Sequence, residues 1–280
     1  MSALGQNPDL ADFSGRLVLV GAGNMGGALL EGWLRLGLDP HKVAVLEPLP
    51  SPPISALTSR GLRLNPALNT LVDVSALVVA VKPQIAAQML PALAPMISDR
   101  TVVVSIMAGR TLRFIAGALQ RDRAIVRAMP NTPAAIGRGI TVAVALNATP
   151  AQRELSHRLL AATGAVEWIE DEMLMDAVTA VSGSGPAYVF LLAEAVTQAG
   201  VAAGLPPALA AKLARETIAG AGELLHRSAL EAAALRQNVT SPGGTTAAAL
   251  AVLMNENGLT QLMTKAVQTA TARSRELAGG

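Results

Sequence analysis

A glycine-rich turn near the start of the chain limits its fold more than any other feature. An apolar run, Leu17–Val20, leads through the motif GAGNMG (Gly21–Gly26) into residues with helical spacing. Gly21 permits a tight turn, Gly23 lets the backbone approach a pyrophosphate, and Gly26 lets the helix pack close to the strand. The free N–H groups at the helix start then face the phosphates. We therefore predict dinucleotide binding here; the alternative is that these glycines only make a tight turn.

Short apolar runs alternate with helical segments as far as residue 169. The predicted strands are Arg16–Val20, Lys42–Leu46, Ala76–Val81, Thr101–Ile106, Ala124–Met129, Thr141–Leu146 and Ala165–Ile169. The predicted helices are Ala28–Leu36, Gln84–Met96, Thr111–Gln120 and Pro150–Ala162. Strands separated by helices indicate a parallel sheet that is covered on both faces, so we predict an α/β domain over residues 1–169.

The remaining residues, 170–280, predict a second domain that is all-helical. Its predicted helices are Pro186–Ala203, Pro206–His226, Ala229–Gln237, Thr245–Asn255 and Leu259–Leu277. The first of them is apolar on nearly every side, and such a helix has to be buried on every side. We therefore predict that this domain is a dimer interface.

Composition excludes several classes of function. The net charge is only +2 and like charges form no long block, which argues against nucleic-acid binding and against binding to a membrane surface. The chain has no cysteine, so disulfides, thiolate nucleophiles and cysteine-ligated metals are excluded. Its three histidines, His41, His157 and His226, lack metal-ligand spacing, and we predict no metal site. We find no signal peptide and no apolar run long enough to cross a membrane, so we expect a cytoplasmic protein.

Charged residues end two of the predicted strands. The carboxyl ends of strands line the ligand crevice in sheets of this kind. Glu47 can accept hydrogen bonds from the adenosine ribose and would repel a 2′-phosphate; the alternative is a solvated loop acid. Lys82 follows the strand Ala76–Val81, where the alternative is an ordinary surface lysine. After the next strand, the small residues of Ser105–Gly109 leave room for a flat cofactor ring.

The turn Ser241–Thr246, with the sequence SPGGTT, precedes an apolar helix. Backbone N–H groups at a helix start can hold a carboxylate, and the hydroxyls of Ser241 and Thr246 can add hydrogen bonds. The alternative is plain N-capping, but a cap needs only one such residue.

Five motifs, taken together, closely resemble those of the pyrroline-5-carboxylate reductases. They are GAGNMG (Gly21–Gly26), AVKPQ (Ala80–Gln84), RAMPNTP (Arg127–Pro133), SGSGPAYVF (Ser182–Phe190) and VTSPGGTT (Val239–Thr246), in the family's order and spread over nearly the whole chain. The resemblance implies a Rossmann-type N-terminal domain, a C-terminal all-α dimerisation domain, and often a ring of dimers. It also implies NADPH or NADH as cofactor and reduction of the C=N bond of 1-pyrroline-5-carboxylate to L-proline.

The resemblance further implies site residues. The cofactor would be bound by Gly21, Ala22, Gly23, Asn24, Met25, Gly26, Ala80, Val81, Lys82, Pro83, Ala108 and Gly109. Asn69 joins them only if a small gap is allowed. The substrate would be bound by Ser241, Gly243, Gly244, Thr245 and Thr246, and the Thr246 hydroxyl would meet the ring nitrogen as the catalytic group. One departure is Leu46–Glu47, where many relatives carry a small or hydroxyl residue; it argues against the family's common preference for NADPH.

The implied chemistry asks little of the protein, since a protonated imine is already electrophilic and needs only correct placement beside the cofactor. A related imine reductase or a β-hydroxyacid dehydrogenase is an alternative, but the latter uses a lysine early in the helical domain and this chain has none between Glu170 and Ala211. A non-catalytic dinucleotide-binding module is a further alternative, against which the intact SPGGTT turn argues. Hydrolase chemistry at Ser184 lacks the G-x-S-x-G elbow.

Overall fold

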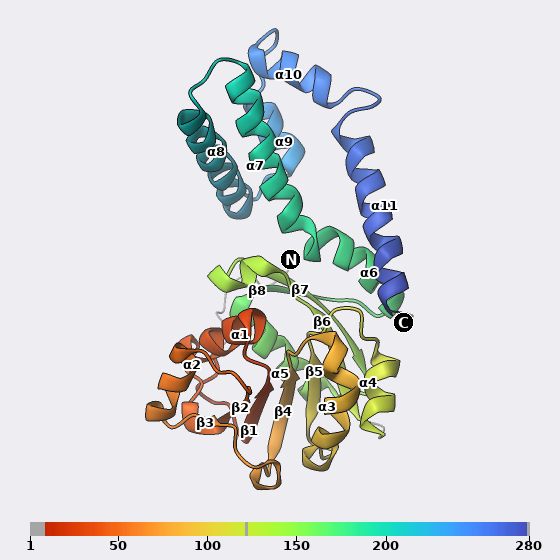
Figure 1. The fold of residues 1–280 in the computed structure, drawn as a ribbon. Helices are drawn as coiled ribbons and strands as arrows, with labels where there is room; N and C mark the ends of the chain where they lie inside the picture. Colours follow the sequence, from red (N-terminus) through yellow and green to blue (C-terminus); the bar gives the residue numbers. More distant parts are fainter. Residues whose placement is uncertain (1–8, 121–122, 279–280) are drawn as a thin grey trace. The chain divides into compact units, whose positions relative to one another are not determined.

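The computed structural model describes residues 9–120 and 123–278. Eight strands form one sheet in the order β3-β2-β1-β4-β5-β6-β7-β8 (Figure 1). Their bounds are β1 Arg16–Val20, β2 Val43–Leu46, β3 Arg63–Leu64, β4 Val74–Val79, β5 Val102–Ser105, β6 Ala124–Met129, β7 Gly139–Leu146 and β8 Gly164–Trp168. All seven predicted strands are present, and among the described residues only the two-residue β3 at the sheet edge was not predicted.

The sheet is parallel as predicted except between one pair of strands. β7 pairs antiparallel with β6, with Arg127 opposite Val144, whereas β8 pairs parallel with β7. The physical reason is the connection: only the short 3₁₀ turn Thr132–Ile136 joins β6 to β7. A parallel return needs a crossover of a dozen or more residues, so this connection allows only an antiparallel neighbour.

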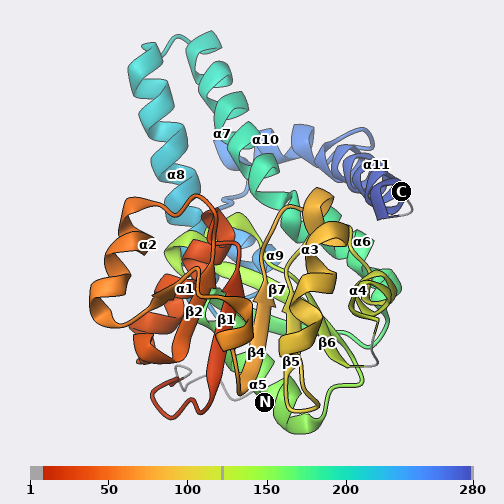
Figure 2. The same ribbon diagram turned by 60° about the horizontal axis from the view of Figure 1, so that its bottom comes forward.

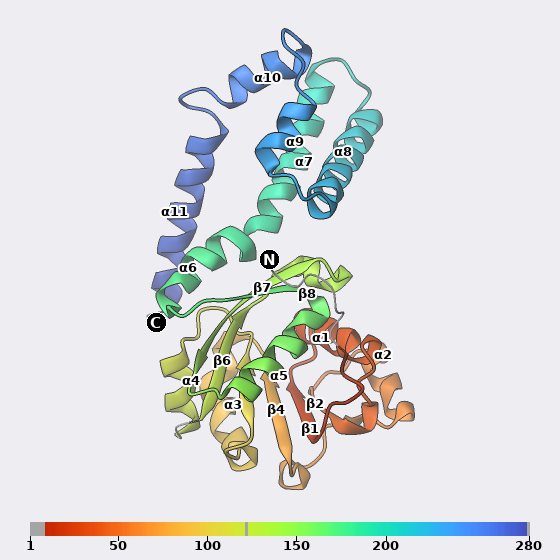
Figure 3. The ribbon, with the colours of Figure 1, turned by 180° about the vertical axis from the view of Figure 1, so that it is seen from behind.

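Helices cover both faces of the sheet, as predicted. Their bounds are α1 Asn24–Arg35, α2 Pro52–Ala56, α3 Ala86–Leu93, α4 Leu112–Leu119, α5 Pro150–Leu160 and α6 Met175–Val178. Leu17 and Leu19 of β1 pack with α1 and α5, whereas Val18 and Val20 pack with α3 and α4, because alternate residues of a strand face opposite sides. Figure 1 shows α3 and α4 in front of the sheet, and Figure 3 shows α5 from behind.

Specific contacts fix α1 on its face of the sheet. The indole of Trp33 is fully buried, and its Nε1 donates a hydrogen bond to the carbonyl of Leu159 in α5 at 2.8 Å. The start of α5 is a capping box, in which Thr149 and Gln152 satisfy each other's backbone N–H groups. α1 is therefore held where its first turn meets the glycine motif.

The described residues after Trp168 contain helices and turns but no strand, as predicted. The longer helices are α7 Gly185–Ala202, α8 Pro207–Arg227, α9 Ala232–Asn238, α10 Thr245–Leu253 and α11 Leu259–Ala278. α7 and α8 lie side by side (Figure 2). The fold is thus a Rossmann-type α/β domain followed by helices.

The chain forms two compact units. The helical unit is Ser184–Ala270, and the sheet unit contains the described residues up to Gly183 together with those from Thr271 onwards. The division into compact units does not test the domain boundary that the sequence predicts after residue 169, so that boundary stays a prediction. Within the sheet unit, the end of α11 is held by Ser274, whose hydroxyl donates to Asp176 of α6 at 2.6 Å.

Apolar side chains of α7 are open to solvent in the single chain. Phe190 and Leu191 are 64% and 62% exposed, and Val189, Leu192 and Val196 are each more than two-fifths exposed. A monomer rarely leaves so many large apolar side chains of one helix uncovered. Within the described residues, no helix is both long and apolar enough to span a membrane.

Candidate functional site

The glycine motif forms a turn between β1 and α1 that tolerates no side chain at two of its three glycines. Gly21 has φ +88°, and a Cβ built on it would lie 2.7 Å from the carbonyl oxygen of Ala80. A Cβ on Gly26 would overlap the carbonyl oxygen of Gly21, so the first turn of α1 packs directly on the end of β1. A Cβ on Gly23, by contrast, meets no atom of the described residues within 4 Å. The space beside Gly23 is therefore open to a ligand.

The start of α1 has the properties of an anion site. Gly23 is its N-cap and has no side chain with which to cap the first N–H groups of the helix. The first turn contains no acidic residue that would compete for those groups. Since the N-terminal end of a helix carries partial positive charge, this turn favours a phosphate.

Glu47 is bonded to the glycine turn. Its Oε2 accepts the backbone N–H of Ala22 at 2.8 Å, and its Oε1 accepts that of Leu49 at 3.0 Å. Asn65 holds the backbone of Glu47 from the other side: its Oδ1 accepts the Glu47 N–H at 2.8 Å and its Nδ2 donates to the Glu47 carbonyl at 2.9 Å. The carboxylate therefore has a fixed position beside the turn.

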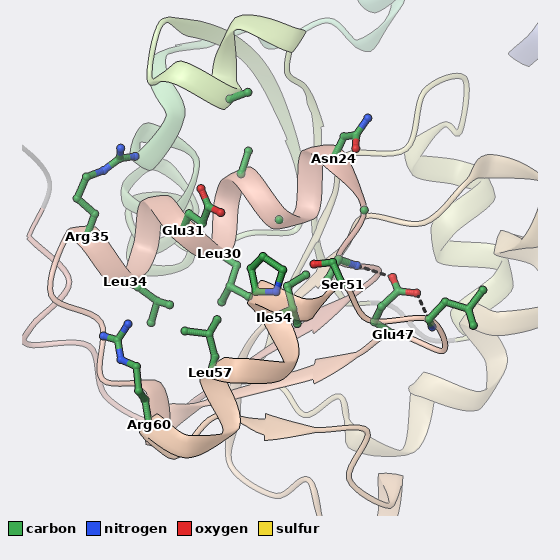
Figure 4. Close-up of a pocket in the computed structure, with 17 residues that line it drawn as sticks. Asn24, Leu30, Glu31, Leu34, Arg35, Glu47, Ser51, Ile54, Leu57 and Arg60 are labelled. Atoms are coloured by element: carbon green, nitrogen blue, oxygen red, sulfur yellow. Dashed lines mark hydrogen bonds between the residues drawn. The ribbon is translucent and has the colours of Figure 1, made fainter.

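Two cavities meet at Glu47. One, of about 890 Å³, lies between α1 and α2, with Asn24, Glu31, Arg35, Ser51 and Arg60 on its walls (Figure 4). The other, of about 640 Å³, lies at the carboxyl ends of β1, β2 and β4. Its lining is mainly apolar and includes Leu46, Leu68, Val81, Ile85 and Met89. Glu47 and Gly23 line both cavities, so the acid and the open glycine stand where the two join.

The structure gathers most of the predicted cofactor residues here. Gly21, Ala22, Gly23, Asn24, Glu47, Ala80, Val81 and Lys82 line one or both cavities. Met25, Gly26, Pro83, Ala108 and Gly109 line neither cavity. Asn69 is exposed and lines neither cavity, whereas Asn65, which the sequence analysis passed over, lines the second.

The loop after β5 is bonded to the loop after β4. The N–H of Ile106 donates to the carbonyl of Val79 at 3.0 Å, and Nε of Arg110 donates to the carbonyl of Pro83 at 3.1 Å. Gly109, between these two bonds, has φ +69°. Hydrogen bonds thus join the two predicted cofactor loops, Ala80–Pro83 and Ala108–Gly109, at the carboxyl ends of β4 and β5.

The predicted substrate turn lies in the helical unit, at the start of α10. Gly243 has φ +70°, and the N–H of Gly244 donates to the carbonyl of Ser241 at 3.1 Å. Gly244 is the N-cap of α10 and contributes no capping side chain. Thr246, in the first turn of the helix, is half-buried, whereas Thr245 is exposed. The turn therefore presents helix N–H groups and a nearby hydroxyl, which together suit a small carboxylate.

An ion pair between a buried arginine and a partly buried glutamate was not predicted from the sequence. Nη1 of Arg127 in β6 lies 2.7 Å from Oε1 of Glu172, and the two side chains are 7% and 26% exposed. The signal was present in the sequence: a charged residue within the apolar run Ala124–Met129 needs a buried partner. The partner itself could not be found from the sequence, because it lies 45 residues away.

Two family models match the chain. The model described as pyrroline-5-carboxylate reductase dimerisation matches residues 172–277, and the model described as NADP oxidoreductase, coenzyme F420-dependent, matches residues 16–109. The first covers the SPGGTT turn and the second covers the glycine turn and Glu47.

Relatives of this chain match over nearly their whole length. It is 41% identical to the pyrroline-5-carboxylate reductase of Synechocystis and 37% identical to that of Pseudomonas aeruginosa; it covers 98% and 97% of them, and each match includes 94% of this chain. Among solved structures, the pyrroline-5-carboxylate reductase of Coxiella burnetii superposes with a TM-score of 0.88 at 32% identity, covering 94% of this chain and 98% of that one. The Plasmodium falciparum enzyme, solved with NADP bound, superposes with a TM-score of 0.78 at 29% identity, covering 95% and 98%.

Proposed function

Because this chain belongs to the pyrroline-5-carboxylate reductase family, we propose a role for each of the two sites described above. The protein is an NAD(P)H-dependent oxidoreductase that reduces the C=N bond of 1-pyrroline-5-carboxylate and so forms L-proline. When bound, the cofactor supplies a hydride from its nicotinamide ring. The protein's own task is to hold the substrate and the cofactor in contact and to exclude water.

The glycine turn would hold the pyrophosphate of the cofactor. The open space at Gly23 and the uncapped N–H groups of α1 fit this role. The apolar cavity beside Ala80–Lys82 suits the adenosine, and the joined loops Ala80–Pro83 and Ala108–Gly109 would flank the nicotinamide half.

Glu47 would accept hydrogen bonds from the adenosine ribose and disfavour a 2′-phosphate. The support is its fixed carboxylate at the junction of the two cavities. A dinucleotide without the 2′-phosphate then binds without like-charge repulsion, so we infer a preference for NADH in this chain.

The SPGGTT turn would hold the substrate. The observation that supports this most directly is the start of α10, where a glycine N-cap leaves the first N–H groups without a capping side chain and Thr246 is half-buried beside them. These N–H groups would bind the substrate carboxylate, and the Thr246 hydroxyl would orient the ring nitrogen. The hydroxyl counts as catalytic because it would touch the reacting C=N bond.

The test is the loss of nicotinamide absorbance with pyrroline-5-carboxylate, run in parallel with NADH and NADPH. Thr246→Val should lower kcat/KM roughly tenfold or more, the loss expected for one hydrogen bond to a charged group. Thr246→Ser keeps the hydroxyl and should retain most activity. Thr260→Val, at the start of α11, is the matched control in the same unit. Equal kinetics in Thr246→Val and Thr260→Val would contradict the role of Thr246.

The chain carries a dimerisation domain, and we propose that it works as a homodimer through the exposed face of α7. Burial of Phe190 and Leu191 against a second copy would remove the largest exposed apolar area of that helix. A ring of dimers is the next level of assembly that we propose for it. Because it consumes reduced nicotinamide cofactor, we also propose a cytoplasmic location, which fractionation of cells would test.

A further inference from the structure

The side chain of Arg127 is a buried positive charge on one face of the sheet. It lies in β6, paired in register with Ser105 of β5 and Val144 of β7. Alternation along the strand directs it to the same face as Ile125, which belongs to the apolar core under α3 and α4. A charge in such surroundings is retained at a cost unless it is paired and hydrogen-bonded. Arg127 meets both conditions through Glu172, so the elements that this partner holds determine what the ion pair does.

Glu172, the partner of Arg127, accepts hydrogen bonds from two different elements. Oε1 of Glu172 accepts a hydrogen bond from Nη1 of Arg127 at 2.7 Å and another from the backbone N–H of Leu112 at 2.8 Å. Leu112 is the first residue of α4, where N–H groups lack partners within the helix and a negative charge is favourable. One carboxylate oxygen therefore joins the middle of the sheet to the start of α4.

The loop Ala108–Gly109 lies between that joint and the end of β5. At its first end, Ile106 is bonded to Val79 of the neighbouring strand. At its other end, the N–H of Leu112 is held by Glu172. Gly109 itself has φ +69°, a conformation that only a few residue types adopt readily. The loop is also held at Arg110, whose Nε donates to the carbonyl of Pro83 at 3.1 Å. Its conformation therefore depends on several contacts, and Glu172 supplies the one at the start of α4.

Glu172 is itself well anchored. Its 3₁₀ turn, Glu172–Leu174, is capped by Asp171, whose Oδ1 accepts the N–H of Met173 at 2.8 Å. Met175, at the start of α6, is fully buried, and Asp176 accepts the hydroxyl of Ser274 at 2.6 Å. The carboxylate of Glu172 is thus presented to Arg127 and Leu112 by a segment that is already fixed.

We propose that Arg127 and Glu172 are positioning residues for hydride transfer, which act by fixing the start of α4 and with it the loop Ala108–Gly109. This inference rests on the proposed placement of the nicotinamide ring at that loop. Without the ion pair, the loop takes up more conformations, and fewer of them hold the ring at reacting distance. A displacement of about 1 Å can cost a hundredfold in rate, so the effect falls on kcat. The KM for pyrroline-5-carboxylate, which is bound by the SPGGTT turn, changes little.

Glu172→Gln tests the proposal because it keeps the shape and one acceptor for Leu112 but removes the charge. We expect kcat to fall roughly tenfold, with the KM for pyrroline-5-carboxylate within about twofold of wild type. We also expect the primary isotope effect with C4-deuterated cofactor to rise, because hydride transfer becomes more rate-limiting. Arg127→Lys keeps the charge but loses the planar fork, and its kcat should lie between wild type and Glu172→Gln.

The matched control is Glu170→Gln, which breaks the more exposed Arg153–Glu170 ion pair of the same unit, 2.8 Å long. It should leave kcat and the isotope effect unchanged. All variants are assayed well below their thermal midpoints, so that only folded protein is compared. If Glu172→Gln lowers the thermal midpoint but keeps the wild-type kcat and isotope effect, the pair is merely structural and the inference is overturned.

Ala108→Phe separates this inference from the cofactor placement on which it rests. The Ala108 side chain is exposed on the loop, so a bulky replacement there should raise the KM for the cofactor or lower kcat. If it does neither, the ring does not lie at this loop, and both the placement and the inference fail. If Ala108→Phe impairs the enzyme but Glu172→Gln does not, the placement stands and only the positioning role is lost.

Discussion

The carboxylate of Glu47 accepts the backbone N–H of Ala22 at 2.8 Å, so the acid that ends β2 is bonded to the glycine turn that ends β1. The second carboxylate oxygen is bonded to Leu49. These two bonds fix the direction of the charge, and an acid whose direction is fixed cannot turn away from a cofactor phosphate. In the proposed cofactor site, this fixed direction is what would make Glu47 a determinant of cofactor choice.

Glu47→Gln should shift the cofactor preference toward NADPH. Removal of the charge removes the repulsion of a 2′-phosphate while one side-chain oxygen remains for hydrogen bonding. We expect the ratio of kcat/KM for NADH to that for NADPH to fall by about tenfold or more, because a like-charge contact at about 4 Å costs between about 1 kcal/mol in bulk water and about 4 kcal/mol near a protein surface. Glu31→Gln, an exposed carboxylate on the wall of the same cavity, is the control. An equal shift in both variants would show that only the net charge matters.

Gly23→Ala and Gly26→Ala should have different consequences. An alanine at position 23 meets no described atom within 4 Å, so the thermal midpoint should stay near wild type while the Kd for the dinucleotide rises. An alanine at position 26 overlaps Gly21 and should lower the thermal midpoint as well. Gly27→Ala, whose Cβ makes only an ordinary 3.5 Å contact, is the control in the same helix. A loss of stability in Gly23→Ala would contradict the open space inferred there.

Phe190→Glu should dissociate the proposed dimer. A charge placed at a side chain that is 64% exposed costs the single chain little, but it would have to be desolvated in a helix interface. Light scattering at micromolar concentration should give a dimer for wild type and a monomer for the variant. Val72→Glu, at an apolar side chain in the sheet unit that is 60% exposed, should remain a dimer. A monomeric wild-type protein would contradict the proposed assembly.

Arg127 and Glu172 should be coupled in stability as well as in catalysis. Arg127→Met leaves a partly buried carboxylate unpaired and should lower the free energy of unfolding by about 3 kcal/mol. Arg127→Met combined with Glu172→Gln should cost less than the sum of the two single changes, because no unpaired charge remains. Urea unfolding at one fixed protein concentration gives the free energy of unfolding of wild type, the two single variants and the double variant. Strict additivity would mean that the pair has no net coupling.

Local patterns predicted much of the fold correctly. Arg16–Val20 and Ala124–Met129 have the predicted bounds. Both are short apolar runs between turn residues, which suits interior strands that are covered on both faces. Gly21 has the positive φ that the tight turn requires. The direction of β7 was not predictable in this way, since parallel and antiparallel strands share the same apolar pattern and only the connection distinguishes them.

The candidate site shows the same division. The sequence indicated Gly21, Gly23, Gly26, Glu47 and Lys82 by their positions in a turn motif or at a strand end. The family resemblance added neighbouring residues, among them Ala22, Asn24, Ala80 and Val81. Neither indicated Asn65, whose side chain holds the backbone of Glu47, or the bond from Arg110 to Pro83. Both contacts join residues that are distant in the chain.

The sequence alone determined which residue types stand together: a glycine-rich turn between a strand and a helix, a hydroxyl-rich turn before another helix, and a helix that is apolar on nearly every side. The tertiary structure decided which charges meet. Arg127 pairs with Glu172, which lies 45 residues later in the sequence. The same carboxylate accepts the backbone N–H of Leu112 at the start of α4. The separation of residues along the sequence does not reveal such contacts. They form only when several elements pack on one face of the sheet, where a buried charge needs an oppositely charged partner.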